Sequence, residues 1–361
     1  MKKKSTVTEE IESKFREQAQ QDKKVKNAYL LVHSGKLGID INIAEGKTGE
    51  IRANPEQANH LASVGKLFTA TLVSMLRDKE LLSFDDKIVK YLDTDLMRDL
   101  HVYKGKDYSA DINIKHLLKQ TSGLNDVFFP LLEKMMNDPT LEMTVKEALE
   151  WGKANLKPIG KPGQKHFYTD TNYYLLGLII ENITKKPFHE AVHEMILEPL
   201  EMDNAYINGY SEPKNKPQYP PASIYLSNIN FIEDKRIAKI DYAGGGVVAP
   251  LSEFLVFMKA LVNGQLVKQA TLNQMVNDDV KMGFPAIGFN YGYSVWKTRA
   301  IPVLMPEKYF CWGCVGVTGA FMFFHPQTEA YVIGTFNDKS YRSKALRFMF
   351  KEVIGPLLKS K

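Results

Sequence analysis

The chain has 361 residues, of which 44% are hydrophobic and 25% are charged, values typical of a folded globular protein with a sizeable core. Its 47 basic and 42 acidic side chains leave a net charge of +5, too small an excess to indicate nucleic acid as a partner. The two cysteines, Cys311 and Cys314, are too few for a disulfide-stapled scaffold or an all-cysteine zinc module. The length fits two domains or one composite unit.

Residues 2–4 are lysines, but the apolar stretch that a secretory signal needs does not follow them. The longest apolar run near a candidate span, 173–180, falls far short of the ~20 residues that cross a bilayer. The sequence as written therefore predicts a cytoplasmic protein without an integral membrane segment, or an extracytoplasmic one if a leader has been trimmed.

Hydrophobic periodicity predicts the elements of the N-terminal part and the middle of the chain. Charges at helical spacing predict an exposed amphipathic helix over 6–24, and apolar runs predict strands over 29–33 and 38–43. Apolar residues three and four apart predict a core helix over 63–82. The following segment, 84–205, is helical in pattern and broken by turns.

The sequence pattern of the C-terminal part differs, because it predicts mainly strands. A proline-rich stretch over 208–225 is followed by a predicted helix over 251–263. Alternating patterns predict three antiparallel strands and a closing helix, over 309–316, 320–325, 331–336 and 341–358.

Strands near both ends, with helices between them, predict an α+β fold: an α/β sandwich with a helical insertion. We expect one antiparallel sheet formed by the N- and C-terminal segments. Residues 1–24 would form a helix that packs on the sheet, 25–75 and 241–361 the sheet domain, and 76–240 a mainly helical inserted region.

The clearest chemical signal is the segment Ser63-Val64-Gly65-Lys66 at the start of the predicted core helix. Side chains at i and i+3 share one helix face, so this ammonium group can polarise the serine hydroxyl or accept its proton. The helix N-terminus adds backbone N–H groups and the positive end of its dipole. Because S-x-x-K also occurs by chance, the motif alone leaves a surface serine and lysine as the alternative.

Further motifs accompany this segment in a fixed order. They are 60–70, 82–86, Ile114-Lys115-His116-Leu117-Leu118, Thr121-Ser122-Gly123-Leu124, Pro162-Gly163, 168–173, Leu175-Leu176-Gly177, Glu198-Pro199-Leu200, Gly244-Gly245-Gly246 and 313–319. Together they resemble the serine β-lactamases and penicillin-binding proteins (DD-peptidases), and within them the class C β-lactamase and esterase branch. The resemblance covers about 28–350. It implies a β-lactamase/transpeptidase-like fold and a serine hydrolase that forms an acyl-enzyme from esters, amides or D-amino-acid peptides.

The resemblance also implies roles for the matching residues. Ser63 would be the nucleophile, and Lys66 and Tyr168 would move the proton between the serine and the leaving group. The backbone N–H groups of Ser63 and Val317 would form the oxyanion hole. The lysine ammonium would lower the pKa of the Tyr168 phenol towards neutrality. No metal or organic cofactor is expected, and the expected partner is a small acyl substrate.

Two residues depart from the family pattern in elements expected to bind substrate. Asp170 stands where Asn is usual, which removes an amide donor and adds a negative charge. Cys314 stands where a lysine or histidine would hold a substrate carboxylate, whereas Gly316 fits the close approach of backbone and substrate. The sequence therefore predicts neutral or cationic esters and amides in preference to β-lactams.

Other hypotheses remain open at this point. A non-catalytic binding or scaffold protein could share the fold, although Ser63, Lys66 and Tyr168 are all present. The run His189-Glu190-Ala191-Val192-His193 matches the H-E-x-x-H pattern of zinc peptidases, but no clear third ligand follows it. The glycines at 244–246 fit a dinucleotide motif by letter only, and they predict a tight turn beside the active site. The two cysteines, three apart on a predicted strand, point to opposite faces and are too far apart for a disulfide.

Overall fold

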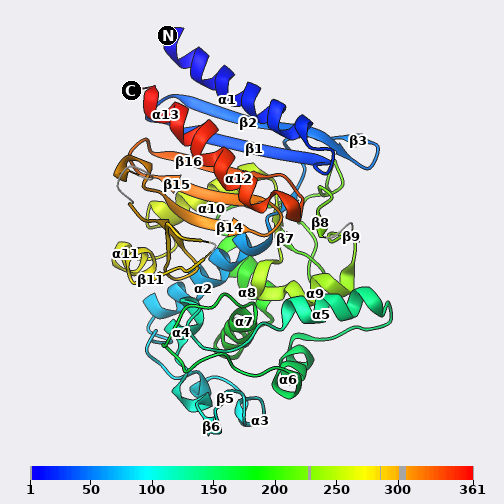
Figure 1. Ribbon diagram of the computed structural model, residues 1–361, viewed down its shortest axis with the longest axis vertical. Helices are drawn as coiled ribbons and strands as arrows, with labels where there is room; N and C mark the ends of the chain where they lie inside the picture. Colours follow the sequence, from blue (N-terminus) through cyan, green and yellow to red (C-terminus); the bar gives the residue numbers. More distant parts are fainter. Residues whose placement is uncertain (1, 227–228, 285, 301–305, 361) are drawn as a thin grey trace.

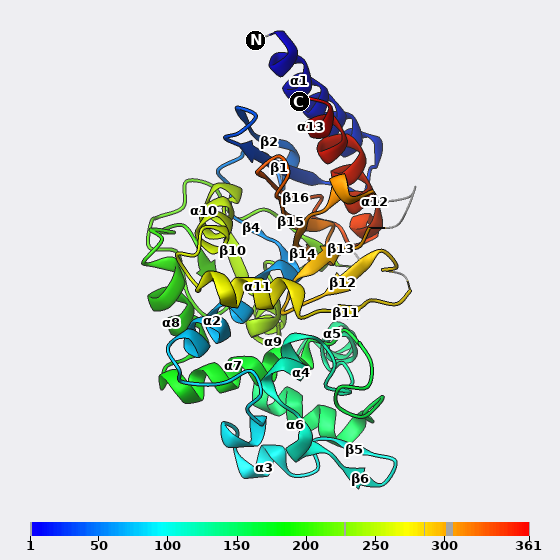
Figure 2. The ribbon, with the colours of Figure 1, turned by 90° about the vertical axis from the view of Figure 1, so that its left-hand side faces the viewer.

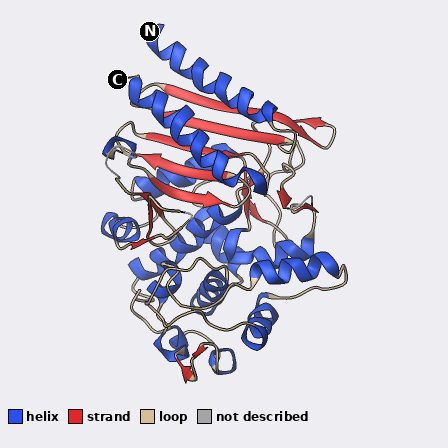
Figure 3. Ribbon diagram, in the orientation of Figure 1, coloured by secondary structure: helices blue, strands red, loops and turns tan. Residues whose placement is uncertain are grey.

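The computed structural model describes residues 2–226, 229–284, 286–300 and 306–360. In these ranges the chain forms one large sheet with helices on both faces and a mainly helical body at one end (Figure 1). Figure 3 shows the long strands gathered in the upper half of the molecule, above most of the helices.

The large sheet has nine strands within the described residues, and all its neighbouring strands are antiparallel. In spatial order they are β11 (Val280–Lys281), β12 (Phe289–Tyr291), β13 (Trp296–Thr298), β14 (Trp312–Gly316), β15 (Ala320–His325), β16 (Ala330–Thr335), β1 (Asn27–Ser34), β2 (Ile39–Thr48) and β3 (Ile51–Arg52). β1 pairs with β16, so that Leu31 lies opposite Ile333. The two ends of the chain therefore meet in the middle of the sheet, and the predicted antiparallel sheet from the terminal segments is confirmed.

The burial of each strand follows from the layers around it. β1 and β16 are buried along nearly their whole length, because helices cover both faces there. The first half of β2 alternates buried and exposed residues, the pattern of a strand with one face towards solvent. The strand predicted over 309–316 begins only at Trp312, because Glu307–Tyr309 form a 3₁₀ turn.

Helix α1 (Lys2–Gln21) packs on one face of the sheet beside the C-terminal helices α12 (Arg342–Phe348) and α13 (Gly355–Lys359) (Figure 1). A π-helical segment over Met349–Ile354 joins α12 to α13. The stripe of α1 that meets the sheet is apolar, with buried side chains every four residues: Val7, Ile11, Phe15 and Ala19. The predicted first helix is therefore present, and it ends at Gln21 rather than at 24.

Helix α10 (Leu251–Val262) covers the opposite face and contacts β1 and β16. It also ties the sheet to the helical body, because the ring of Phe257 stacks 3.7 Å from the ring of Phe68. Phe68 belongs to α2 (Lys66–Asp78), which runs from the sheet into that body (Figure 2). The remaining helices are α3 (Thr94–Met97), α4 (Ile114–Leu118), α5 (Phe128–Asn137), α6 (Val145–Asn155), α7 (Thr171–Thr184), α8 (Phe188–Val192), α9 (Lys235–Gly245) and α11 (Gln269–Asn277).

Helix α7 forms the centre of the helical body. Most of its side chains are buried on all sides, and it contacts α2, α4, α8 and α9. No helix in the described ranges is both long and apolar enough to cross a membrane. Two short antiparallel strand pairs lie outside the larger sheets: β5 (Val102–Tyr103) with β6 (Lys106–Asp107), and β8 (Tyr225–Leu226) with β9 (Ile229–Asn230).

A small three-stranded sheet leads the chain into the candidate site. It consists of β4 (Asn59–His60), β10 (Val247–Ala249) and β7 (Tyr206–Ile207), with β10 in the middle. A 3₁₀ turn, η1 (Ala62–Gly65), follows β4 and runs directly into α2. The core helix predicted over 63–82 is thus a 3₁₀ turn followed by an α-helix that ends at Asp78. This arrangement places Ser63 in the turn and Lys66 at the start of α2.

Candidate active site

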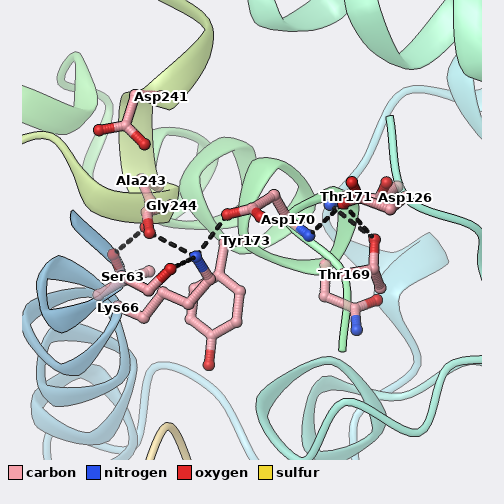
Figure 4. Close-up of polar contacts among 12 residues, drawn as sticks. Ser63, Lys66, Asp126, Thr169, Asp170, Thr171, Tyr173, Asp241, Ala243 and Gly244 are labelled. Atoms are coloured by element: carbon pink, nitrogen blue, oxygen red, sulfur yellow. Dashed lines mark hydrogen bonds and ion pairs between the residues drawn. The ribbon is translucent and has the colours of Figure 1, made fainter. Parts of the chain in front are cut away.

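Ser63 and Lys66 meet at the junction of η1 and α2. Ala62 adopts a φ of 49°, so the chain turns sharply just before Ser63. Lys66 Nζ lies 3.0 Å from Ser63 Oγ. The side chain of Lys66 is fully buried, and Nζ also donates to the Asp170 carboxylate and to the Gly244 carbonyl (Figure 4). The structure therefore brings the predicted nucleophile and its lysine within hydrogen-bond distance.

The charge state of Lys66 depends on opposing effects. Burial favours the neutral amine and lowers its pKa, but the charge of Asp170, the Tyr168 phenol and the hydrogen bond to Asp170 act in the opposite direction. The net effect raises the pKa of Lys66 well above its usual value of 10.5. Lys66 is therefore an ammonium in the resting protein, and it donates to Ser63 Oγ.

Asp170 precedes α7 and binds Lys66. Burial raises the pKa of its carboxyl group to about 6, although the Lys66 ammonium opposes that rise. The backbone N–H of Asp170 donates to Asp126 Oδ1 over 2.8 Å, which fixes the position of Asp170. The sequence predicts a substrate contact for Asp170, and the structure places its carboxylate on the nucleophile's lysine while the residue also lines the cavity described below.

Tyr168 lies beside the same ammonium. Lys66 Nζ is 5.3 Å from the centroid of the phenol ring, and the ring of Tyr291 packs edge-on against it at 5.9 Å. The hydroxyl is buried and makes no hydrogen bond of good geometry among the described residues, although the Ser63 side chain lies near enough to lower its pKa. Burial raises the pKa of Tyr168 above 10 and outweighs the lowering by Lys66. Lys66 thus acts in the expected direction but does not bring the pKa of Tyr168 towards neutrality in the resting protein, because burial is the larger effect.

Strand β14 presents its two faces to different surroundings, as the period of two in a strand requires. Val315 and Val317 line the cavity in front of Ser63. Gly316 faces η1 instead, and a Cβ there would lie only 2.3 Å from the Leu61 carbonyl oxygen. The close approach predicted for Gly316 is therefore made to the turn that carries the nucleophile. Val317, predicted to supply an oxyanion N–H, lies on the cavity together with Ser63.

Cys314 lies on the same face of β14 as Gly316. Its thiol is fully buried and donates to the backbone carbonyl of Ser63 over 3.2 Å. Cys314 is absent from the described residues that line the cavity, so the structure places it behind the wall where a substrate contact is predicted. Burial raises the pKa of Cys314 to about 12, which keeps the thiol neutral. Cys311 is also a free, buried thiol.

The glycine run at the end of α9 packs against η1 and α2. Tyr242, with φ 40° and ψ −122°, breaks the helix just before this run. A Cβ on Gly244 would lie 2.7 Å from Asp170 Oδ1, and one on Gly65 would lie 2.7 Å from the carbonyl carbon of Gly245. Side chains at these positions would push Lys66 and its partners apart. The predicted place of the glycines, beside the active site, agrees with these contacts.

A cavity of about 610 Å³, its open mouth included, lies in front of Ser63. Its walls are largely apolar, and aromatic rings supply much of that surface: Phe128, Phe129, Phe231 and Trp296. The charged residues on it are Asp170, Asp241 and Arg342, of which Arg342 is exposed. A mostly apolar cavity with a few convergent polar groups is typical of a small-molecule site.

Two cavity residues, His60 and Asp241, are not predicted from the sequence. Their side chains are buried, and His60 Nε2 lies 2.7 Å from Asp241 Oδ2. They are 181 positions apart, so no local spacing connects them. The only available signal is that His60 lies three residues before Ser63 and Asp241 three residues before Gly244.

The zinc-peptidase match lies away from this cavity. His193 Nε2 is 3.0 Å from the Ser211 hydroxyl, and the ring of His189 packs 5.7 Å from the ring of Tyr210. The part of the chain that the structure describes holds no group of three or more His, Cys, Asp or Glu side chains that could bind a metal ion. His189 and His193 therefore have no third ligand there.

An antiparallel sheet with helices on both faces, and a serine–lysine pair at the head of a central helix, define the class of serine β-lactamases and penicillin-binding proteins. The model of the Beta-lactamase family matches residues 12–353, and the chain belongs to this family. Protein flp of Staphylococcus aureus (strain MW2) is 28% identical over 179 residues, which cover 48% of this chain and 33% of that protein. A putative D-alanyl-D-alanine carboxypeptidase of Escherichia coli (strain K12) is 28% identical over 166 residues, 44% of this chain and 36% of that protein. The matched part thus spans about a third of the length of these relatives.

Solved structures share the fold at low sequence identity. A D-stereospecific amidohydrolase from Streptomyces sp. has a TM-score of 0.76 at 20% identity and covers 96% of this chain and 99% of its own. The D-amino acid amidase from Ochrobactrum anthropi SV3 has a TM-score of 0.78 at 18% identity, with coverage of 98% and 99%. EstCE1, described as a hydrolase with promiscuous acyltransferase activity, has a TM-score of 0.77 at 17% identity, with coverage of 98% and 99%. The predicted family and the β-lactamase/transpeptidase-like fold are confirmed, and the comparisons support a hydrolase.

Proposed function

We propose that the protein is a serine hydrolase that forms an acyl-enzyme at Ser63 and acts on neutral or cationic amides and esters. The observation that carries this proposal is the Ser63 hydroxyl at 3.0 Å from a buried ammonium, on the wall of a largely apolar cavity. A serine that is hydrogen-bonded to a buried lysine and open to a cavity is the arrangement expected of an activated nucleophile.

In the first step Ser63 Oγ attacks the acyl carbon, so that an O–C bond forms and the carbonyl oxygen becomes an oxyanion. The backbone N–H groups of Ser63 and Val317 stabilise that oxyanion. Neither Lys66 nor Tyr168 is a ready base at rest, because both carry their protons. A proton relay works without a free base. The Tyr168 hydroxyl passes its proton to the leaving group and receives the proton of Ser63, while Lys66 remains an ammonium. The bond to the leaving group then breaks.

In the second step water replaces the leaving group. Its oxygen attacks the acyl carbon, its proton returns through Tyr168 to Ser63 Oγ, and the ester bond of the acyl-enzyme breaks. The acid and the free serine are the products, so the atoms balance without a metal or an organic cofactor.

The substrate class follows from the charges around the site. A lysine or histidine at position 314 would attract a carboxylate, whereas the Cys314 thiol is neutral and turned away from the cavity. Two carboxylates, Asp170 and Asp241, line the cavity with one buried ammonium, Lys66, beside them, so the buried negative charges outnumber the buried positive one. A β-lactam carboxylate is therefore disfavoured, and amides, for which the neighbouring amidohydrolase and D-amino acid amidase are named, fit this site better.

The test compares two chromogenic substrates in the purified protein. We expect kcat/KM for p-nitrophenyl acetate to exceed that for a chromogenic cephalosporin, and we expect Ser63→Ala to abolish both reactions. Ser74→Ala, which removes a buried hydroxyl from α2, is the matched control and keeps the activity. Faster turnover of the cephalosporin contradicts the substrate class. A lack of both turnover and covalent labelling of Ser63 by a fluorophosphonate favours the non-catalytic alternative.

A further inference from the structure

Asp241 and His60 form a buried pair on the wall of the cavity that holds Ser63. Asp241 lies at the end of α9, where the kink at Tyr242 turns the chain towards η1. A Cβ on Gly245 would lie 2.7 Å from Asp241 Oδ1 and 3.0 Å from the Ala62 carbonyl oxygen. The carboxylate of Asp241 is therefore close to the turn that carries the nucleophile, and Figure 4 shows Asp241 in one view with Ser63 and Lys66.

The hydrogen bonds of His60 determine what it offers to Asp241. His60 Nδ1 accepts from the backbone N–H of Ala62 over 3.1 Å, so this nitrogen carries no proton. The proton therefore lies on Nε2, which donates to Asp241 Oδ2. A neutral imidazole satisfies both contacts. His60 fixes the orientation of the carboxylate and contributes no positive charge to balance it.

The partners of the neighbouring carboxylates are different. Asp170 binds the Lys66 ammonium, and Asp126 accepts from the backbone N–H groups of Asp170 and Phe129. Within the described part of the chain, the one hydrogen-bond or ion-pair partner of Asp241 is His60. Asp241 thus retains an acceptor oxygen, in a residue that is only 7% exposed and lines the cavity. The nearby Lys66 ammonium interacts with Asp241 through space but donates its hydrogen bond to Asp170, so these two carboxylates share one cation.

An anion with spare acceptor capacity in a largely apolar cavity is complementary to a cationic donor. The other charged group on the wall that could bind such an anion, Arg342, is exposed at the N-terminal end of α12, where solvent screens it. A substrate ammonium can therefore bind Asp241 without displacing a protein cation.

We propose that Asp241, held by His60, binds a primary ammonium group of the substrate, so that the site takes amides and esters whose acyl group carries an amine. This inference rests on the proposed hydrolase function and specifies its substrate class. It makes Asp241 a specificity-determining residue and His60 a positioning residue, since His60 acts through Asp241.

The experiment compares a free-amine substrate, D-alanine p-nitroanilide, with its N-acetylated form and with p-nitrophenyl acetate. In the wild-type protein we expect the free amine to be preferred over the N-acetyl form. Asp241→Asn should lower kcat/KM for the free amine by about 10- to 100-fold, the usual range for a hydrogen bond to a charged group. The loss should be specific to the amine, so that the ratio of kcat/KM for the free amine to kcat/KM for p-nitrophenyl acetate falls by about the same factor. Glu253→Gln removes another buried negative charge, away from this cavity, and should leave the preference intact.

A second measurement uses the wild-type protein, so it does not depend on the folding of a variant. D-Alanine amide should protect Ser63 from a fluorophosphonate at lower concentration than N-acetyl-D-alanine amide does. Equal protection, or equal loss of all three substrates in Asp241→Asn, overturns the assignment of Asp241. Ester turnover without any amine preference overturns this inference and leaves the proposed function standing, whereas no turnover and no labelling overturn both.

Discussion

The Asp170–Lys66 pair allows a quantitative test through Asp170→Asn. The substitution keeps an oxygen acceptor for Lys66 Nζ and removes only the negative charge, so the geometry at Ser63 is retained. Two unit charges about 4 Å apart interact by about 4 kcal/mol at an effective dielectric constant of 20. At 1.36 kcal/mol for each pKa unit, the pKa of Lys66 should fall by about 3. Burial also lowers the pKa of Lys66, and without the Asp170 charge the effects that oppose burial are weaker.

The assay is an NMR titration of protein labelled with ¹³C at the lysine Cε, with Lys66 assigned from the signal that disappears in Lys66→Met. We expect the Lys66 signal to titrate at lower pH in Asp170→Asn than in the wild-type protein. Asp278→Asn is the matched control, because its carboxylate binds Lys119 and the change in net charge is the same. A Lys66 titration that is unchanged within about 0.5 pH unit, or that moves upwards, refutes the assignment of Asp170 as the group that keeps Lys66 protonated.

Three further changes test other parts of the site. Tyr168→Phe should lower kcat by about 100-fold or more, since a proton-transfer group is lost. Urea unfolding should show little loss of stability, because the buried hydroxyl makes no hydrogen bond of good geometry among the described residues; a large loss of stability with normal kcat contradicts both assignments. Gly65→Ala should destabilise the protein by about 1–3 kcal/mol and reduce turnover, because its Cβ would lie 2.7 Å from the Gly245 backbone. In Gly35→Ala the new Cβ would have nothing within 4 Å, so this control should be neutral in the same unfolding and activity assays. Burial lowers the pKa of His166 from 6.5 to about 4, so the unfolded chain binds this proton more readily than the folded protein. The stabilising contribution of His166 is therefore complete above pH 6.5 and is lost as the pH falls towards 4. His166→Phe should make the difference in unfolding free energy between pH 7 and pH 5 smaller, and an unchanged difference contradicts this expectation.

Much of the sheet and the serine–lysine pair can be predicted from local pattern. Strand 320–325 agrees with β15, and the four-residue apolar spacing of α1 is visible in the sequence because the helix packs along one stripe. The contact of Ser63 with Lys66 follows from their separation of three residues, which any helical turn brings together. Spacing in the sequence thus predicts contacts within one helical turn.

The remaining features depend on tertiary contacts between distant segments. The pairing of Asp170 with Lys66 joins α7 to α2, and that of His60 with Asp241 joins β4 to α9, so no local pattern contains them. The sequence predicts the pKa of Tyr168 from one neighbour, the lysine, whereas the packing around the phenol decides its direction. From the sequence, Cys314 is expected to face the substrate. The motif alone does not show which side of β14 meets η1, and the structure places the thiol against the backbone carbonyl of Ser63.

The central claim, that Ser63 is an acylated nucleophile, is tested most directly by mass spectrometry of the protein after reaction with a fluorophosphonate. We expect one modified peptide, the one that contains Ser63, and no modification at this site in Ser63→Ala. Labelling of another serine in preference to Ser63, or amide and ester turnover that survives in Ser63→Ala, would contradict this claim.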